Sequence, residues 1–310
     1  MSSNYSPTAP SDSATATAAA ASSGAFLQSF LGLQGKVALV TGSTSGLGRA
    51  MAETLCAAGC HVVVNGARDP ERTARAARDI AAHCHVDDVG GGDDATVDPT
   101  TSFPRVLAAH GDASKPEQAA AVVEAIRSTF DGRLDILVNN AGINLPEDIF
   151  EIQYNHESWQ KLNAVNLEGP MNMTQAALPL LKSSTSPRII NVSSMIGHAG
   201  SPTNTLYTMT KAAIQLFTKS LAAQLANEPG TKNGNVITVN SVSPGIFDTD
   251  MNAKFTLGPE ESLKAVENGI PMRRLGKPQE VTGAVLYLAS EAASYTTGTD
   301  IVVDGGYLAV

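Results

Sequence analysis

The sequence predicts an α/β protein in which helices cover both faces of a parallel sheet of seven strands. From Lys36 onward, short apolar runs alternate with longer segments of helical pattern, which is typical of βαβ units. The short runs are apolar almost throughout rather than at every second position, as expected for strands buried on both faces. With 310 residues, 43% of them hydrophobic, the chain can also bury a large core.

The elements follow one another in a regular order. The seven candidate strands are short runs rich in Val, Ile and Leu, at Val37–Val40, His61–Val64, Arg105–Leu107, Leu134–Val138, Arg188–Val192, Val236–Val239 and Asp300–Val303. The helices expected between them are longer and of mixed polarity, at Leu47–Ala58, Pro70–Ala82, Pro116–Phe130, Glu157–Leu181, Thr205–Ala226 and Pro278–Ala289.

Two segments interrupt this alternation. His85–Pro104 is longer than the usual connection and contains three consecutive glycines, so we expect a loop insertion there. Phe247–Met272 follows the sixth strand and is irregular. Because ligands in open α/β sheets bind outside the carboxyl ends of the strands, we expect residues 247–272 to be a lid over the substrate.

The first 34 residues differ from the rest of the chain in composition. They are rich in Ser, Thr and Ala and carry almost no charge, so we expect a disordered tail followed by one domain over residues 35–310. Transit peptides are rich in Arg, whereas the tail contains no Lys or Arg. A cytoplasmic location is therefore expected, with organelle targeting as the alternative.

The charge and the cysteine content bear on several functional classes. The 30 acidic and 21 basic residues give a net charge of −9, which argues against a nucleic-acid partner. No apolar run approaches the ~20 residues of a membrane span. An odd number of cysteines, three in all, argues against a disulfide framework and favours a reducing compartment. His83-Cys84-His85 could ligate a metal, but no second ligand cluster follows at zinc-like spacing, so no metal is expected.

A glycine-rich segment follows the first strand, at Thr41-Gly42-Ser43-Thr44-Ser45-Gly46-Leu47-Gly48. Glycines let the backbone turn tightly and approach a pyrophosphate, whose charge is stabilised by the amides at the start of the next helix. The spacing G-x-x-x-G-x-G differs from the commoner G-x-G-x-x-G fingerprint. A simple strand-to-helix connection is the alternative, but the position in the first βαβ unit favours a dinucleotide.

Tyr207 and Lys211 lie four residues apart in a segment expected to be helical, so their side chains fall on the same side of the helix. A nearby ammonium lowers the pKa of a tyrosine from its usual value near ~10. Such a phenol can exchange a proton with a carbonyl or alcohol oxygen. Taken alone, however, so short a pattern is better explained by an ordinary amphipathic turn of a helix.

Six motifs occur in order along the chain: Thr41-Gly42-x-x-x-Gly46-x-Gly48, Asn139-Asn140-Ala141-Gly142, Asn166, Ser194, Tyr207-x-x-x-Lys211 and Pro244-Gly245. Together they resemble the short-chain dehydrogenase/reductase family over residues 35–310, and most closely its 3-oxoacyl carrier-protein reductases and related carbonyl reductases. The resemblance implies a Rossmann-like, doubly wound sheet in a single domain. It also implies an oxidoreductase that transfers a hydride between a nicotinamide cofactor and a carbonyl or secondary alcohol.

The resemblance implies a catalytic tetrad of Asn166, Ser194, Tyr207 and Lys211. Tyr207 would be the general acid in reduction and the base in oxidation. Ser194 would donate a hydrogen bond to the substrate oxygen, which gains negative charge as the hydride arrives. Lys211 would lower the pKa of Tyr207 and bind the nicotinamide ribose, and Asn166 would hold a water that links Lys211 to solvent.

The resemblance also implies which residues contact the cofactor. These are Gly42, Ser43, Ser45, Gly46 and Leu47 in the glycine loop, Arg68, Asp112 and Ala113 near the adenosine, Asn140, Ala141 and Gly142 near a ribose, Tyr207 and Lys211, and Pro244, Gly245, Ile246 and Thr249 near the nicotinamide.

The end of the second strand bears on the choice between NADP(H) and NAD(H). An acid there accepts hydrogen bonds from the 2′-hydroxyl of NAD, whereas an arginine accommodates a 2′-phosphate. By family resemblance the acid position falls on Gly66, with Arg68 just beyond it, which favours NADP(H). Asp69 beside Arg68, and Ser45 where many NADP enzymes carry a basic residue, keep NAD(H) as the alternative.

The substrate is the least constrained part. Ile143-Asn144-Leu145-Pro146 lacks an Arg-Asp pair common in the carrier-protein reductases, and the residues expected to line the pocket are mostly apolar, which favours an apolar ketone or alcohol. His198 could contact the substrate or lie in an exposed loop. The family's assembly implies a homodimer or homotetramer formed through the helices at 157–181 and 205–226. A non-catalytic nucleotide-binding scaffold, or a dehydratase or epimerase, are the alternative functions.

Overall fold

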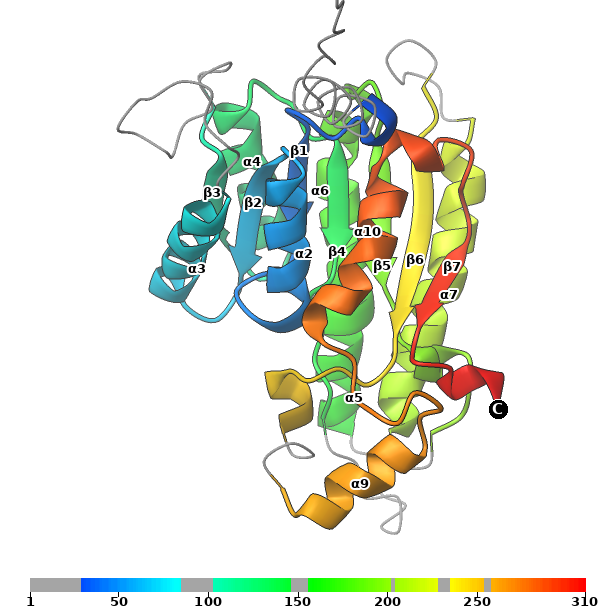
Figure 1. The fold of residues 1–310 in the computed structure, drawn as a ribbon. Helices are drawn as coiled ribbons and strands as arrows, with labels where there is room; N and C mark the ends of the chain where they lie inside the picture. Colours follow the sequence, from blue (N-terminus) through cyan, green and yellow to red (C-terminus); the bar gives the residue numbers. More distant parts are fainter. Residues whose placement is uncertain (1–28, 85–102, 146–155, 202–203, 228–234, 254–257) are drawn as a thin grey trace, which may run out of the picture.

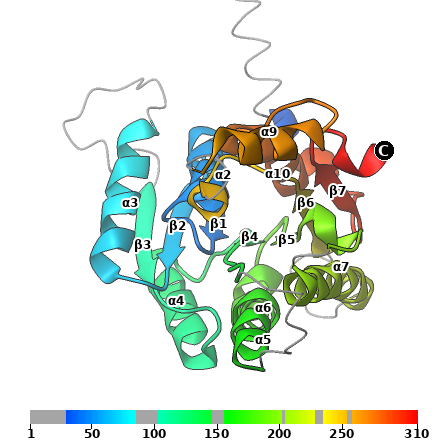
Figure 2. The same ribbon diagram turned by 90° about the horizontal axis from the view of Figure 1, so that it is seen from below.

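The computed structural model describes residues 29–84, 103–145, 156–201, 204–227, 235–253 and 258–310. Residues 1–28 of the predicted tail, 85–102 of the predicted insertion and 254–257 of the predicted lid lie outside these ranges. The described residues form one parallel sheet of seven strands with helices on both faces, as the sequence predicts (Figures 1 and 2).

The strands are ordered β3-β2-β1-β4-β5-β6-β7, so the chain begins in the middle of the sheet and extends it first on one side and then on the other. Their bounds are β1 Val37–Val40, β2 His61–Gly66, β3 Val106–His110, β4 Ile136–Asn139, β5 Arg188–Val192, β6 Thr238–Pro244 and β7 Asp300–Val303. Every neighbouring pair is parallel. All carboxyl ends therefore meet at one edge, and the order reverses between β1 and β4, where such sheets bind ligands.

The helices cover the sheet in two layers (Figure 2). One layer contains α2 Gly46–Ala57, α3 Pro70–His83 and α10 Thr282–Ala289, and the other contains α4 Pro116–Thr129, α6 Gly169–Lys182 and α7 Thr205–Leu225. Each layer packs on its face of the sheet through its own cluster of buried apolar side chains. The shorter α5 His156–Asn163 and α9 Glu260–Asn268 lie beyond the carboxyl edge of the sheet (Figure 1).

The helix predicted over Glu157–Leu181 is interrupted. Between α5 and α6 the backbone forms a π-helical segment over Ala164–Glu168. Pro170 follows two residues later, in the first turn of α6, and has no N–H to donate to the residue four positions earlier. The continuous α-helical ladder therefore breaks here, and Asn166 lies in the wider turn, where π segments are often functional.

The prediction for the sixth strand was wrong in its bounds, since β6 begins at Thr238 and continues to Pro244 instead of ending at Val239. The predicted strand ended where the apolar run ends, and the residues after it are polar. In the fold they are buried and paired: the Asn240 amide donates to the Thr296 carbonyl at 2.8 Å, and the Ser241 hydroxyl donates to Asp300. The short helix α9 was not predicted at all.

The odd number of cysteines argued against a disulfide framework, but the structure contains one disulfide. Cys56 on α2 and Cys84 just after α3 form a disulfide, with their Cα atoms 5.8 Å apart. The odd count argued against a framework of several bonds but could not exclude a single one. The two helices run side by side on one face of the sheet, which brings their carboxyl ends together. Cys60 is a buried free thiol.

The disulfide also bears on the possible metal ligands around Cys84, because a cystine sulfur is no thiolate ligand. Within the described ranges, no group of three or more His, Cys, Asp or Glu side chains could hold a metal ion.

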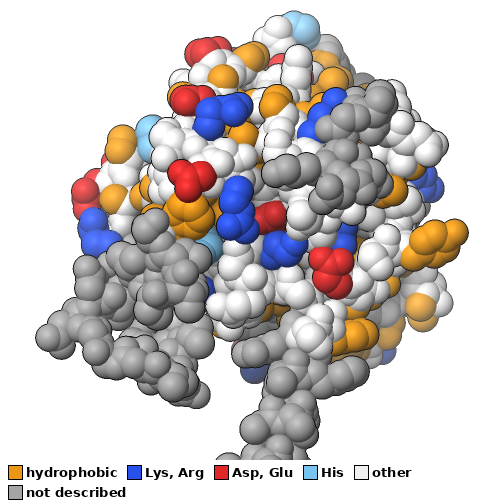
Figure 3. All heavy atoms as spheres, turned by 90° about the horizontal axis from the view of Figure 1, so that it is seen from above, with side chains coloured by type: hydrophobic (Ala, Val, Ile, Leu, Met, Phe, Trp, Pro, Cys, Tyr) orange, Lys and Arg blue, Asp and Glu red, His pale blue; other side chains and the backbone are white. Residues whose placement is uncertain are grey.

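None of the described helices is long and apolar enough to cross a membrane. On the amino-terminal edge of the sheet, basic and acidic side chains are interspersed (Figure 3), and Lys36 and Arg188 there both lie near Glu291.

Candidate active site

The predicted site residues gather at the carboxyl edge of the sheet. There the glycine loop after β1 contacts the loop that follows β4. Gly42 and Gly46 have φ angles of +65° and +58°, which glycine adopts without the strain other residues meet. A Cβ on Gly42 would lie 2.9 Å from the Cα of Ala141. The Thr41 hydroxyl accepts hydrogen bonds from the amides of Asn140 and Ala141, each at 3.0 Å. The loop is thereby fixed to the end of β4.

The first amides of α2 have the properties of an anion site. Ser45 is the N-cap residue, but its side chain makes no capping hydrogen bond, and the first turn of the helix contains no acid. The amides of this turn can therefore serve a phosphate. Ser43 lies in the same loop but points inward, since its buried hydroxyl donates to the Val40 carbonyl at 2.7 Å and accepts from the Asn65 amide at 3.0 Å. Only the Ser43 backbone can take part in cofactor binding in this conformation.

Ser194, Tyr207 and Lys211 come together across β5 and α7. Ser194 follows the end of β5 and caps the short helix η2 Met195–Gly197, and its hydroxyl is hydrogen-bonded to Tyr207. Lys211 lies one turn beyond Tyr207 on α7, with its Nζ 5.6 Å from the centre of the tyrosine ring. The same ammonium donates to the Val192 carbonyl at 2.9 Å.

Burial controls the protonation of this group of residues. The pKa of Lys211 is lowered from 10.5 to about 8, because the ammonium is removed from solvent. Burial raises the pKa of the Tyr207 phenol to about 12, against the opposite and smaller effect of the Ser194 hydrogen bond. The Tyr207 pKa thus shifts opposite to the direction expected from the sequence. The Lys211 ammonium lies over the ring and bonds to Val192, which limits its stabilisation of the phenolate.

Asn166 is buried behind this group on the π-helical segment. Its Oδ1 accepts from the Ile143 amide at 2.8 Å, and its Nδ2 donates to the Ile143 carbonyl at 2.9 Å and to the Thr210 hydroxyl at 3.2 Å. A Cβ on Gly142 would lie 3.4 Å from Oδ1 of Asn166 and 3.5 Å from Nζ of Lys211. Asn166 therefore links the loop after β4 to α7.

The residues predicted near the nicotinamide follow β6. Gly245 packs closely, since a Cβ there would lie 2.6 Å from the Cα of Asp304. Thr249 reaches the glycine loop, because its Cγ2 lies 3.7 Å from the place a Cβ would take on Gly46. Ile246 accepts the Gly276 amide through its carbonyl at 3.0 Å. Pro244, the last residue of β6, thus begins a segment that brings Thr249 beside the start of α2.

The residues predicted near the adenine follow β3. The Asp112 carboxylate accepts the Ser114 amide through Oδ1 at 2.9 Å. The side-chain Nδ2 of Asn65 donates to the carbonyls of both Ala109 and Gly111 at 3.0 Å, which fixes this segment to the end of β2. Ala113 is buried, and its carbonyl accepts from Asn172 at 3.2 Å.

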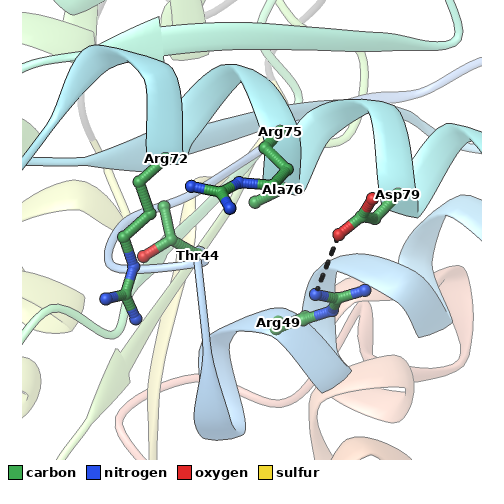
Figure 4. Close-up of a pocket in the computed structure, with 6 residues that line it drawn as sticks. All are labelled: Thr44, Arg49, Arg72, Arg75, Ala76 and Asp79. Carbon is green, nitrogen blue, oxygen red and sulfur yellow. Dashed lines mark hydrogen bonds and ion pairs between the residues drawn. The ribbon is translucent and has the colours of Figure 1, made fainter.

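The end of β2 adds residues that the sequence analysis missed. A cavity of about 230 Å³ between α2 and α3 is lined by Thr44, Arg49, Arg72, Arg75, Ala76 and Asp79 (Figure 4). Arg49 pairs with Asp79 at 3.4 Å, whereas Arg72 and Arg75 form no ion pair with any described residue. Arg72 and Arg75 lie three and six residues after Asp69, in the first two turns of α3. Two basic residues one helical turn apart were a usable signal.

Gly66, Arg68 and Asp69, the residues at the end of β2 that bear on cofactor choice, differ in their surroundings. Arg68 is exposed. The Asp69 carboxylate caps α3, accepting the amides of Glu71 at 3.0 Å and Arg72 at 3.3 Å. Asp69 is thus already occupied in the helix cap. At Gly66, a Cβ would lie 2.6 Å from Cγ2 of Thr44, which leaves no room for an acidic side chain unless Thr44 moves.

Comparisons with known proteins show which family the chain resembles. A family model described as enoyl-(acyl carrier protein) reductase matches residues 42–308. The 3-oxoacyl-[acyl-carrier-protein] reductase FabG of Aquifex aeolicus is 39% identical over 277 residues, which cover 88% of this chain and 98% of the relative.

Two solved structures show the same fold. A gluconate 5-dehydrogenase from Burkholderia cenocepacia, in complex with NADP and tartrate, aligns with a TM-score of 0.77 at 28% identity, covering 92% of this chain and 99% of that one. The RhlG/NADP active-site complex of Pseudomonas aeruginosa aligns with a TM-score of 0.76 at 31% identity, covering 90% and 98%. The chain therefore belongs to the short-chain dehydrogenase/reductase family of oxidoreductases.

Proposed function

We propose that this protein interconverts a ketone and a secondary alcohol with NADP(H), using Tyr207 as the general acid or base. The observation that carries the proposal is the grouping of Ser194, Tyr207 and Lys211 at the same sheet edge as the glycine loop. A binding module has no need of a half-buried tyrosine whose hydroxyl is hydrogen-bonded to a serine and whose ring lies near a buried lysine. That grouping favours the enzyme over the scaffold.

In this proposal the protein's residues act on the substrate oxygen. Ser194 donates a hydrogen bond to that oxygen and thereby places it next to the Tyr207 hydroxyl. Tyr207 gives up its proton as negative charge develops on the oxygen, or takes the proton in the reverse direction. The nicotinamide, when bound, supplies or accepts the hydride.

Lys211 and Asn166 support the proton transfer. The lowered pKa of Lys211, about 8, lets its ammonium release and regain a proton near neutral pH. Asn166 holds the loop after β4 against α7 through its bonds to Ile143 and Thr210. We propose that this arrangement keeps a proton path open from Tyr207 through Lys211 to solvent.

The chain offers a cradle that fits a dinucleotide. The uncapped start of α2 and the glycines of positive φ suit a pyrophosphate, with the backbone from Gly42 to Leu47 as its contact. The closed space at Gly66 disfavours an acid for the 2′-hydroxyl of NAD. The basic cavity beside it suits a 2′-phosphate, to which Arg72, Arg75 and the exposed Arg68 can extend. These features support NADP(H) over NAD(H).

Apolar side chains near the site support an apolar substrate. Met195 follows Ser194 and is buried, and Ile246 follows Gly245. A homodimer or homotetramer is further supported by exposed apolar side chains on the two helices of the predicted interface, Met171 on α6 and Met209 and Leu216 on α7, which are 46%, 50% and 66% exposed. Light scattering of the purified protein tests the assembly, and a monomer would contradict it.

The reaction is tested by following absorbance of the reduced cofactor with simple ketones, 3-oxoacyl thioesters, sugars and steroids, each with NADPH and NADH. We expect oxidation of NADPH with at least one apolar ketone or thioester, at a kcat/KM above that with NADH. A preference for NADH would overturn the cofactor assignment. Absence of turnover with every carbonyl, despite NADPH binding, would favour the scaffold.

A further inference from the structure

The loop that carries Ser194 is connected at one end to Asp300, the first residue of β7. The Asp300 side chain is only 9% exposed, and its Oδ2 lies 2.7 Å from Nε2 of His198, four residues after Ser194. Its other oxygen, Oδ1, accepts hydrogen bonds from the hydroxyls of Ser241 at 2.5 Å and Ser243 at 3.0 Å. One carboxylate therefore joins β7, β6 and the loop after β5.

The other end of the loop returns to the same carboxylate through α7. Nε2 of Gln215 donates to the Ser243 hydroxyl at 3.3 Å and to the Ser194 carbonyl at 3.4 Å. Gln215 lies one turn beyond Lys211 on α7, and its amide lies directly under the turn of the loop, since a Cβ on Gly197 would be 2.7 Å from Nε2 of Gln215. The contacts form a closed ring from Ser194 through Gln215, Ser243 and Asp300 to His198.

The ring is more polar than packing alone requires. Ser241 and Ser243 lie on one face of β6, two residues apart, where apolar side chains would pack at lower desolvation cost. Their hydroxyls are buried and bonded to Asp300. A charged group that is bonded by several donors in fixed directions holds its partners in one geometry. The residue that these contacts hold in place is Ser194, at the start of the loop.

We propose that Asp300 and His198 are positioning residues that hold the Ser194 hydroxyl where it meets the substrate oxygen. The inference rests on the proposed role of Ser194. Neither residue lies in the group formed by Ser194, Tyr207 and Lys211, and both act through the loop. Displacement of a positioned group by about 1 Å is enough to lower a rate by about 10²-fold, so loosening the ring should affect turnover more than cofactor binding.

The test compares His198→Ala with His198→Gln, since glutamine keeps a side-chain donor for Asp300. We expect His198→Ala to lower kcat about tenfold, leave the KM for NADPH within about twofold, and be partly rescued by His198→Gln. The matched control is His83→Ala, which removes another exposed histidine, one bonded only to a helix carbonyl, and should leave kcat unchanged. Wild-type kcat in His198→Ala, or no recovery with glutamine, would overturn the proposal.

A second comparison asks whether His198 acts through Ser194. In a Ser194→Ala background, His198→Ala should lower kcat by less than about twofold, because the positioned hydroxyl is already gone. An equal loss in both backgrounds would assign His198 another role and contradict the proposal.

Amide hydrogen exchange gives a readout that needs no turnover. The amides of Gly197 and His198 donate to the carbonyls of Ser194 and Met195, each at 3.0 Å, and both should exchange at least tenfold faster in His198→Ala and in Asp300→Asn than in the wild type. If the wild type reduces no carbonyl, the proposed function fails while this measurement still tests the ring. Unchanged exchange in an active enzyme would overturn the ring alone.

Discussion

The two halves of the sheet differ in how their residues reach the candidate site. On the side of β1 and β2, Gly42, Gly46 and the first amides of α2 offer backbone groups; β1 is wholly apolar, and the buried Asn65 of β2 serves only to bind neighbouring backbone. On the side of β5 and β6, the site consists of side chains, and the strands bury polar residues such as Asn191 and Ser243. Backbone groups are positioned by the fold itself, whereas side chains that move protons need further polar contacts to hold them.

The difference shows what each half can tolerate. A backbone cradle depends on glycines and on close approach, so it is sensitive to added volume and insensitive to the chemistry of its neighbours. A side-chain site depends on the protonation and direction of a few groups, so it is sensitive to the loss of single atoms. Four predictions test this contrast, from the largest expected effect to the smallest.

The largest effect is expected at Tyr207. Tyr207→Phe removes one hydroxyl and should lower kcat by about 10²–10⁴-fold, the usual contribution of a general acid or base, without changing the Kd of NADPH. Stopped-flow or steady-state kinetics and cofactor fluorescence measure the two quantities. The matched control is Tyr295→Phe at a fully exposed tyrosine. Retained turnover in Tyr207→Phe would remove the tyrosine from the chemistry.

Breaking the disulfide should lower the stability of the protein, because the bond joins two helices of the cofactor-binding half. It should leave kcat unchanged, because the catalytic side chains lie in the other half. Cys56 and Cys84 are 28 residues apart, and closing a loop of that length stabilises a fold by about 3.5 kcal/mol in the chain-entropy model. Urea denaturation with and without dithiothreitol should show this loss, with kcat at 25 °C unchanged. A Cys84→Ala variant serves as control, because its unfolding curve should not respond to dithiothreitol. A reductant-sensitive kcat would contradict the separation of the two halves.

Lys211 should give the side-chain half a pH-dependent stability. Its pKa is 10.5 in the unfolded chain and about 8 when buried, so between these values the unfolded state holds the extra proton. The free energy of unfolding should therefore be larger at high pH by about 3 kcal/mol, and this difference should be lost as the pH falls from 10.5 to 8.

Lys211→Met should abolish that contribution, so the difference in unfolding free energy between wild type and variant should change by this amount over the same pH window. Chemical denaturation at several pH values, without cofactor, measures it. Lys219→Met removes an exposed ammonium from the same helix and should change the pH dependence far less. Parallel curves for wild type and Lys211→Met would mean that the ammonium is hydrated in the fold.

The smallest effect is expected in the basic cavity. Removing both guanidinium groups with Arg72→Ala and Arg75→Ala should raise the KM for NADPH about tenfold, equivalent to one charge-assisted hydrogen bond, and leave the KM for NADH unchanged. Arg78→Ala is the matched control, because Arg78 on the same helix pairs with Glu71 at 2.8 Å. Equal changes for both cofactors would place the 2′-phosphate elsewhere.

Much of the fold could be predicted because the strands are continuous apolar runs in the sequence. All seven appeared, and the order of the glycine loop, Asn166, Ser194 and Tyr207 located the residues that the fold brings together. What failed depended on partners distant in sequence. The end of β6 was not predicted, since Asn240 finds its acceptor at Thr296 and Ser241 finds its acceptor at Asp300 only in the folded chain.

The site was predicted less completely for the same reason. The direction of the Tyr207 pKa shift was misjudged, because desolvation depends on burial that no local motif reveals. The sequence alone could not decide whether Asp69 caps α3 or contacts the cofactor. Nor could it show that Arg72 and Arg75 line one cavity with residues of α2. The Cys56–Cys84 pairing likewise needed the two helices to be placed side by side.

The crowding at Gly66 has a consequence for how cofactor preference can change in this lineage. An aspartate at Gly66 would meet Thr44 before it could reach a ribose, since even its Cβ would lie 2.6 Å from Cγ2 of Thr44. We therefore expect Gly66→Asp alone to lower stability unless Thr44 rotates away, and the Thr73 hydroxyl, 3.0 Å from the same Cβ, would have to shift as well. A change toward NAD at this position thus involves Thr44 and Thr73 as well as Gly66.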